Sequence, residues 1–289
     1  MIKIRIAVVA LLLVGFVWGA AFVLMKDAIK EQPYMDFLAT RFTVAAVAMF
    51  LLRPVVASKL APGDLKYGAV AGVVLAFAYI TQTIGLELTT ASISGFLTGL
   101  YVVLTPLLAW LVLKQKISLK IFIGAVLAAI GLGVLSGAAT TVEFQIGQIW
   151  LIVCAVLYAV HLLVLGKFGQ GRDSYRFAML QIAFVAVVTW VFALADGYQA
   201  PPNGSVWFAI VFTALLSTVF AFWVQTWAQT IIEPSRVALL ITSEVIFTAL
   251  LAVGVGQEPL TLTMVVGGSI MVVAMLLVEW PTSKSKSIK

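Results

Sequence analysis

Apolar residues run along the chain in stretches of about 20, and each stretch ends at a short cluster of charged or turn-forming residues. A helix needs about 20 apolar residues to cross a bilayer, whereas barrel strands give shorter, alternating segments. The pattern therefore predicts transmembrane helices. Ten spans are expected, at Ile6–Met25, Tyr34–Arg53, Lys66–Gly85, Ala91–Leu113, Ser118–Ser136, Ile146–Gly166, Tyr175–Ala195, Ser205–Trp227, Ser235–Val255 and Leu260–Glu279.

The composition supports the same class. Hydrophobic residues make up 63% of the chain and charged residues 10%, against roughly 45–50% and about 25% in soluble domains. Lipid is a solvent for such a surface, and only helices or closed barrels satisfy the backbone there. We expect an all-α protein whose surroundings are the lipid bilayer, with loops too short to hold a soluble domain.

The distribution of positive charge predicts the orientation of the helices. Of the 18 Lys and Arg residues, 15 fall on one side of the expected spans, two (Lys26 and Lys30) fall on the other, and Arg41 lies within a span. Cytoplasmic loops carry the excess of Lys and Arg. Both termini are thus expected in the cytoplasm of a multi-pass protein of the cell (inner) membrane. The net charge of +6 is scattered between apolar runs, so nucleic acid is not an expected partner.

An internal repeat connects the two halves of the sequence. The pattern Phe-Ala-aromatic-x-x-Gln-Thr at Phe77–Thr83 recurs at Phe220–Thr226, an offset of 143 that also pairs Tyr101 with Glu244. An offset near 140 relates the earlier spans. The pairs at that offset include Trp18 with Tyr158 and Arg41 with Gln181. Self-similarity at a fixed offset indicates duplication.

We expect two five-helix repeats, at residues 6–137 and 146–280, and a cytoplasmic tail at 281–289. Because five is odd, the second repeat must enter the membrane from the opposite side. Inverted repeats of this kind are the architecture of many secondary transporters, which alternate access around a site at the bilayer midplane. The expected fold is therefore ten helices in a 5+5 inverted repeat.

Several motifs are similar to those of one transporter family. They are Trp18-Gly19 with Phe22, Lys26, Pro33 and Arg41; Thr89–Ser92 and Gly95–Tyr101 up to Pro106; and Glu244–Ala252, Gly256–Thr261 and Gly267. Together they resemble the ten-helix EamA-type branch of the drug/metabolite transporter superfamily over nearly the whole chain. One departure is Val245, where many members carry proline. The resemblance implies export of small metabolites, with amino acids, aromatic or otherwise hydrophobic ones included, as the favoured substrates.

Glu244, Arg41 and His161 lie inside expected spans and away from their ends, where charge is costly and functional roles are common. Glu244 is interpreted either as a cavity carboxylate that meets an ammonium group or carries a coupling proton, or as a structural partner, for example of Arg41 in an ion pair. For Arg41, a role in an ion pair or at a helix end is the favoured interpretation. His161, the single histidine, is either a packing residue or a cavity group that changes charge near neutral pH.

Polar aromatic residues form a second set of candidates. Tyr79 and Gln82 are three residues apart and share a helix face. The repeat relates Tyr101 to Glu244 and Trp18 to Tyr158, so these residues are predicted to converge on one substrate cavity. Helix packing and interfacial belts are the alternative explanation. Pro106 breaks a helical hydrogen bond and is a candidate hinge.

The sequence gives no sign of soluble-type chemistry. It has no Gly-x-x-x-x-Gly-Lys phosphate loop, so neither ATP hydrolysis nor an ATPase subunit is expected. Its one cysteine, Cys154, lies in an apolar run, and no metal site or cofactor is expected. The prediction is a carrier, not an enzyme, that functions as a monomer. A channel, an intramembrane enzyme, or a carrier for a drug, nucleoside or sugar derivative are the alternatives.

Overall fold

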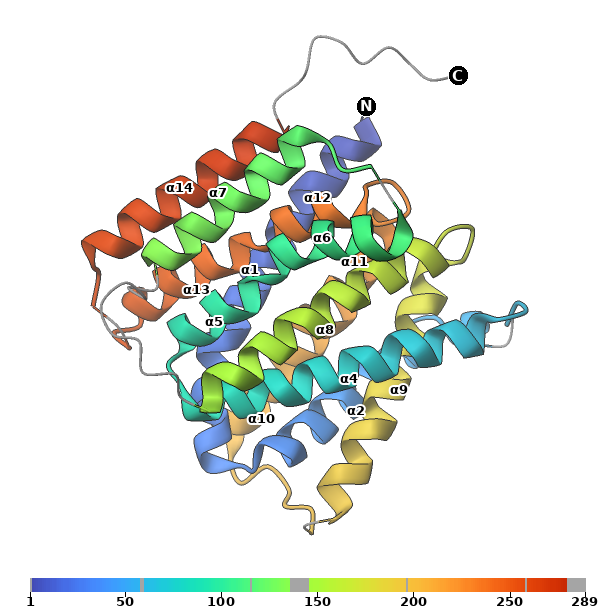
Figure 1. The fold of residues 1–289 in the computed structure, drawn as a ribbon. Coiled ribbons are helices and arrows are strands. Elements are labelled where there is room, and N and C mark those ends of the chain that lie inside the picture. The colour runs from blue at the N-terminus through green and yellow to red at the C-terminus, as the bar shows by residue number, and fades with distance from the viewer. Residues whose placement is uncertain are drawn as a thin grey trace.

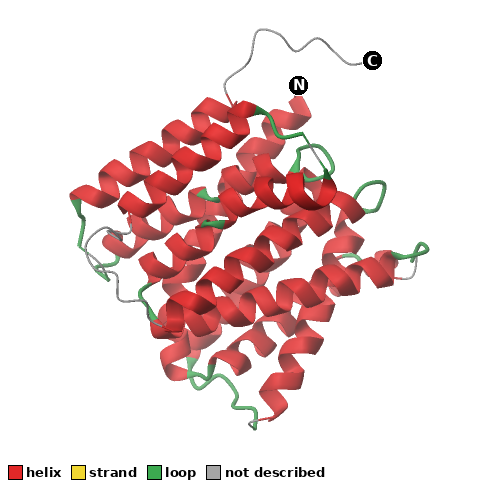
Figure 2. Cartoon of the chain, viewed as in Figure 1, coloured by secondary structure: helices red, strands yellow, loops and turns green. Residues whose placement is uncertain are grey.

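The computed structural model describes residues 2–57, 60–114, 116–135, 146–195, 197–257 and 259–279, and these residues form helices without a strand (Figure 2). The helices are α1 (Ile2–Glu31), α2 (Tyr34–Leu52), α3 (Pro54–Ala57), α4 (Asp64–Leu88), α5 (Ala91–Gly99), α6 (Tyr101–Leu113), α7 (Leu119–Leu135), α8 (Ile146–Phe168), α9 (Ser174–Ala195), α10 (Gly204–Ala214), the π-helical η1 (Leu215–Phe220), α11 (Ala221–Ala228), α12 (Pro234–Ile241), α13 (Ser243–Gly254) and α14 (Leu262–Glu279). The expected segment between the repeats, the end of the fifth span at Ser136 and the tail at 281–289 lie outside the described residues.

The described residues contain eight helices that are long and apolar enough to cross a membrane. Three of these are composite: α5 with α6, α10 with η1 and α11, and α12 with α13. The apolar helices α7 and α14 are shorter. The all-α, multi-pass class is confirmed. Each of the ten expected spans corresponds to one of these helices, while the count of ten crossings stays a prediction.

The expected spans were drawn as regular helices, and three of them are not. One residue with non-α bonding, Leu100, separates α5 from α6, and Thr242 likewise separates α12 from α13. At each break the hydrogen bonding tightens to i→i+3, with Val103 N–H donating to Leu100 O at 3.0 Å and Val245 N–H to Thr242 O at 3.1 Å. Hydropathy cannot detect such turns, because the residues on both sides remain apolar.

The π-helical segment η1 is the third irregularity. It is bonded from outside by two other helices: the Trp18 indole of α1 donates to Ser217 O at 2.8 Å, and Arg41 of α2 donates to Thr218 Oγ1. The Thr218 hydroxyl in turn donates to Thr213 O at 2.8 Å, five residues back. Single-turn π-helices occur frequently at functional sites. Tertiary contacts thus accompany this wider turn.

The helices pack in an interleaved manner, so that segments far apart in sequence are neighbours (Figure 1). Helix α4 lies along α8 and α9, α1 lies along α13, and α7 pairs with α14 at one side. Small residues permit the close crossings. A Cβ at Gly72 would stand 2.5 Å from the Gln181 carbonyl oxygen, and a Cβ at Gly19 would stand 2.8 Å from the Thr248 nitrogen.

Ionic and polar contacts fasten the two ends of the bundle. At one end Asp64, the first residue of α4, forms ion pairs with Arg172 and Arg176 beside the α8–α9 turn. At the opposite end, the loop before α10 is held to α2, because Gln199 N–H donates to Asp36 Oδ2 at 3.0 Å. These contacts join the first half of the chain to the second at both ends.

Candidate functional site

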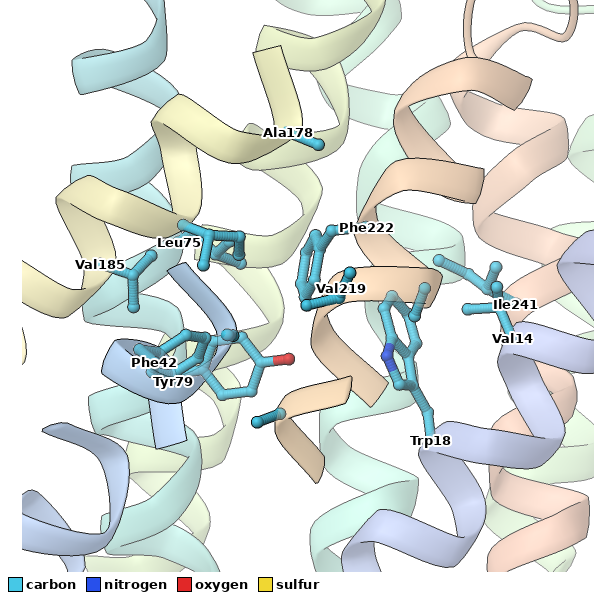
Figure 3. Close-up of a cluster of buried hydrophobic side chains, with 14 of the residues drawn as sticks. Val14, Trp18, Phe42, Leu75, Tyr79, Ala178, Val185, Val219, Phe222 and Ile241 are labelled. Atoms are coloured by element: carbon cyan, nitrogen blue, oxygen red, sulfur yellow. The ribbon is translucent and has the colours of Figure 1, made fainter. Parts of the chain in front are cut away.

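A cavity lies inside the helical bundle and is lined by side chains from both halves of the chain. Figure 3 shows part of its wall, with Trp18, Tyr79 and Phe222 approaching one interior space from three different helices. The lining residues are Trp18, Ala21, Phe22, Met25, Arg41, Tyr79, Gln82, Tyr101, Tyr158, Leu162, Ser217, Phe222, Gln225, Ile241 and Glu244.

The structure brings most of the predicted site residues together. Of the predicted cavity residues, all but His161 line this cavity, and so does Arg41. The set that lines the cavity consists of Trp18, Tyr79, Gln82, Tyr101, Tyr158 and Glu244. The predicted hinge, Pro106, is buried in α6 and is not part of the lining. Residues from both halves of the chain therefore share one interior space.

Arg41 is the only fully buried guanidinium among the described residues, with 1% of its surface exposed. Its Nε and Nη2 atoms donate to Thr218 Oγ1 at 3.2 and 3.0 Å, and Nη2 also donates to Ser217 Oγ at 3.0 Å and to Tyr79 OH at 3.4 Å. Nη1 contacts the Met25 sulfur at 3.1 Å. The guanidinium also lies 4.9 Å from the centre of the Tyr79 ring. Every contact is with a neutral group.

Glu244 is the buried acid of the same cavity, with 4% of its surface exposed. Tyr101 donates its hydroxyl to Glu244 Oε1 at 2.9 Å, across the 143 residues that separate the two repeat positions. The ion pairs of the described residues involve Asp27 and Asp64, and neither Arg41 nor Glu244 takes part in one. The ion pair considered between Arg41 and Glu244 is therefore not formed; each charge has separate, neutral partners.

The surroundings of Tyr101 and Glu244 match closely. Tyr101 is the first residue of α6, and Glu244 the second of α13, so each lies within two residues of an irregular turn. The hydroxyl of Thr105 donates to Tyr101 O at 2.7 Å, and that of Thr248 donates to Glu244 O at 2.8 Å. Two equivalent helix breaks thus meet at one phenol–carboxylate hydrogen bond.

Aromatic rings form much of the remaining wall. Tyr158 stands edge-on to Tyr79 at 5.8 Å and to Tyr101 at 6.3 Å, measured between ring centroids. Its hydroxyl donates to Gln82 Oε1 at 3.2 Å. The Trp18 ring is 5.5 Å from that of Phe222. Such a wall can stack against flat or apolar parts of a solute, while the phenol groups offer hydrogen bonds.

His161, which was interpreted either as a packing residue or as a cavity group, does not line this cavity. His161 is fully buried, and its Nε2 lies 2.7 Å from Gln181 Oε1, while Gln181 Nε2 donates to Thr226 Oγ1 at 3.1 Å. On α8 it is Tyr158 and Leu162, one helical turn apart, that reach the cavity. At about 100° per residue, His161 is rotated away from Leu162 toward α9. This placement fits the packing alternative.

Pro106 lies within α6, several residues beyond the irregular turn at Leu100. The turn at Thr242 in the second half has the same character although Ala249 stands at the position equivalent to Pro106. A proline is therefore not required for such a turn. The hinge role of Pro106 stays a prediction.

Several lining residues were missed from the sequence. Phe222 and Gln225 are the repeat counterparts of Tyr79 and Gln82, so applying the offset of 143 to the site would have found both. Ser217 and Thr218, the ligands of Arg41, were signalled only as two adjacent hydroxyls within an apolar span. Gln225 differs from Gln82 in one respect: its Oε1 atom is buried and accepts no hydrogen bond.

Among the described residues, no group of three His, Cys, Asp or Glu side chains could hold a metal ion. These residues can recognise a solute. Around one space they place the buried cation of Arg41, the buried acid Glu244, aromatic surface, and an amide oxygen, Gln225 Oε1, that accepts no hydrogen bond.

Comparison with known proteins identifies relatives along the whole chain. Residues 5–137 and again residues 145–280 match the model of the EamA-like transporter family. A protein of Archaeoglobus fulgidus named "Uncharacterized transporter" is 29% identical over 96% of this chain and 87% of its own length. "Uncharacterized transporter YoaV" of Bacillus subtilis is 21% identical over 99% of this chain and 100% of its own length. A solved structure titled "Crystal structure of protein" shares the fold, with a TM-score of 0.78 at 16% identity over 95% of this chain and 96% of that one.

Proposed function

The chain belongs to the EamA-like transporter family, and from this premise we propose that it is a secondary transporter that exports small metabolites, in particular amino acids, by alternating access. The observation that carries the proposal is the central cavity, which combines aromatic walls with a buried cation and a buried acid that are not paired with each other. Charged groups inside a membrane protein mark solute pathways by default. The choice of amino acids follows the family resemblance.

The transporter is proposed to cross the cell membrane ten times, as two inverted five-helix repeats. Three observations support this arrangement. The family model matches the chain twice; the turns at Leu100 and Thr242 lie within one residue of the repeat offset of 143; and the start of α1 and the end of α14 lie at the same end of the molecule (Figure 1). That end is proposed to face the cytoplasm, because the loops assigned to it carry 15 of the 18 Lys and Arg residues.

In the proposed cycle, the two halves rock against each other around the cavity, which opens in turn to the cytoplasm and to the outside. The polar contacts at the two ends, Asp64 with Arg172 and Arg176, and Asp36 with Gln199, would break alternately. A single chain contains the whole cavity, so a monomer without an ATPase subunit is proposed to suffice.

Solute counterflow tests this proposal. Purified protein in liposomes is loaded with one unlabelled compound at a time from a panel of amino acids, amines, nucleosides, sugar derivatives and hydrophobic drugs, and uptake of the same compound in labelled form is measured. A carrier gives saturable uptake that is accelerated by internal unlabelled solute, and protein-free liposomes give none. A channel would instead give non-saturating flux without acceleration. Absence of uptake for every compound would refute the transport proposal.

A further inference from the structure

We propose that the cavity is a two-charge site for free amino acids, in which Arg41 binds the substrate carboxylate while Glu244 and Gln225 bind its ammonium group. The inference rests on the proposed transport function and deepens it, because it assigns a role to each charge and names the required chemistry. A substrate would need both an unblocked carboxylate and an unblocked ammonium group.

The anion-binding end follows from the contacts of Arg41. A buried ion is costly unless an opposite charge compensates it, and a guanidinium stays protonated in proteins. Arg41 is 1% exposed, yet its partners are hydroxyl groups, aromatic faces and a thioether. Its Nη1 group contacts only the Met25 sulfur, which is a weak acceptor. The guanidinium therefore has donor capacity left and lines a cavity without a carboxylate of the described chain beside it.

The fixed orientation of this guanidinium fits a carboxylate in particular. Thr218 and Ser217 hold its Nε and Nη2 atoms from η1, so the planar group is preorganised. Because Thr218, Ser217 and Tyr79 take the hydrogens of Nε and Nη2, a substrate carboxylate would accept charge-assisted hydrogen bonds from the Nη1 group. A substrate carboxylate would form the ion pair with Arg41 that no acid of the described residues forms.

The cation-binding end lies with Glu244 and Gln225. Glu244 accepts one hydrogen bond, from Tyr101, and the rest of its acceptor capacity is unused. Gln225 Oε1 is buried in the same lining and has no partner at all. A buried acceptor without a donor costs about 1–3 kcal/mol, and an ammonium group carries three donors. An ammonium group in this cavity could donate to the Glu244 carboxyl group and to Gln225 Oε1.

The two ends explain why Arg41 and Glu244 do not neutralise each other. If they formed an ion pair, each would neutralise the other's charge. A zwitterion would then have to break that pair in order to bind. Held apart on neutral partners, they leave a guanidinium and a carboxyl group in the same space, each without a partner of opposite charge. The rings of Trp18, Tyr158 and Phe222 are then available to the substrate side chain. Apolar and aromatic side chains suit such walls.

Competition in exchange tests the inference on the unmodified protein. Liposomes containing the protein are loaded with a mixture of the twenty protein amino acids, and uptake of the same mixture in labelled form is measured. Three competitor pools are added outside: the free amino acids, their carboxamides, which keep only the ammonium group, and their desamino acids, which keep only the carboxylate. We expect both single-charge pools to compete about tenfold or more weakly, since a site built to bind a polar group rejects analogues that lack it. Equal competition by either pool would overturn the two-charge site.

Matched variants locate the anion-binding end. Arg41→Met is compared with Arg53→Met, which removes an exposed arginine at the end of the same helix, outside the cavity lining. We expect Arg41→Met to lose amino-acid exchange by about tenfold or more and Arg53→Met to retain it. Arg41→Lys, which keeps the charge without the planar fork, is expected to fall between them. Full exchange by folded Arg41→Met would contradict the assignment.

The outcomes separate this inference from the transport function. Carriage of neutral or singly charged compounds from the wider panel, without amino-acid exchange, would overturn the two-charge site and leave the transporter in place. Absence of exchange with every compound would remove both. Size-exclusion profiles and melting curves check the folding of each variant. Were both Arg41 variants unfolded, the competition result on the unmodified protein would decide.

Discussion

Arg41 and Gln181 occupy positions that the sequence repeat pairs, one in α2 and one in α9, and their surroundings differ. Both side chains are buried, with 1% and 0% exposure. The Gln181 carboxamide has a partner at each end, His161 at the oxygen and Thr226 at the nitrogen, and it lies outside the cavity. Arg41 carries a charge with neutral partners only, and it lines the cavity. Gln181 thus has its hydrogen-bond partners within the protein, whereas the charge of Arg41 has no partner of opposite charge there.

The difference distinguishes a structural polar group from a binding group. A satisfied buried network stabilises and specifies the packing of helices, whereas an unmatched buried charge reduces stability and is retained when function needs it. The two halves of a duplicated fold can therefore keep the same backbone and diverge in electrostatics. Each of the following variants tests one side of that contrast.

The largest effect on stability is expected from Gln181→Leu. The change leaves His161 Nε2 and Thr226 Oγ1 without their partner, and each unsatisfied buried group costs about 1–3 kcal/mol. We expect a clear fall in the melting temperature in detergent. Arg41→Met, in contrast, replaces an uncompensated charge by an apolar side chain and is expected to melt at or above the temperature of the unmodified protein. The reverse order of melting temperatures would invalidate the comparison.

Glu244→Gln is expected to have the next largest effect, on transport. The amide keeps a hydrogen-bond acceptor for Tyr101 but has no negative charge for an ammonium group or a coupling proton. Amino-acid exchange should fall by about tenfold; if Glu244 carries a coupling proton, an imposed pH gradient should also no longer drive flux. The control is Glu87→Gln, which alters an exposed acid near the end of α4. Full gradient-driven transport by Glu244→Gln would exclude Glu244 as the coupling group.

A moderate effect is expected from Tyr101→Phe. The substitution keeps the ring and removes the hydroxyl that donates to Glu244 Oε1. A typical hydrogen bond contributes about 1 kcal/mol, which corresponds to about fivefold in affinity. The half-saturation concentration for amino-acid exchange measures this loss. Tyr67→Phe is the control, since Tyr67 stacks on Phe168 outside the cavity lining; a similar change in both variants would contradict a specific role for the Tyr101 hydroxyl.

The smallest effect is expected from Pro106→Ala. The equivalent position in the second half is Ala249, and the irregular turn at Thr242 is present there without a proline. We therefore expect an exchange rate within about twofold of the unmodified protein. A much larger fall would identify Pro106 as a hinge and show that the two halves move differently.

The sequence predicted the spans well because length and hydropathy are properties of each helix alone. Polarity and the repeat also pointed to six of the fifteen residues that line the cavity, among them Trp18, Tyr101 and Glu244. The apolar run at Leu215–Phe220 gave no warning of a π-helix, which bonds with residues some 180 to 200 positions away, such as Trp18.

The direction in which an individual side chain points was the other property that the sequence could not predict. His161 and Tyr158 are one helical turn apart, and hydropathy along a nearly uniform apolar helix does not say which of them faces a cavity. The structure places His161 against Gln181, a contact that depends on how α8 and α9 cross. Similarly, only tertiary structure could show that Gln225 Oε1 is left without a donor while its counterpart in Gln82 has one.

The uncompensated guanidinium of Arg41 also bears on leakage. A fixed positive charge in a narrow, low-dielectric passage repels mobile cations, as the arginine of water channels excludes protons. Whenever the cavity is empty, Arg41 would raise the electrostatic barrier for sodium ions that enter from either side. A cell membrane holds its potential only if its carriers do not conduct. Arg41, which is proposed to bind the substrate carboxylate, would thus also limit ion leakage while no substrate is bound.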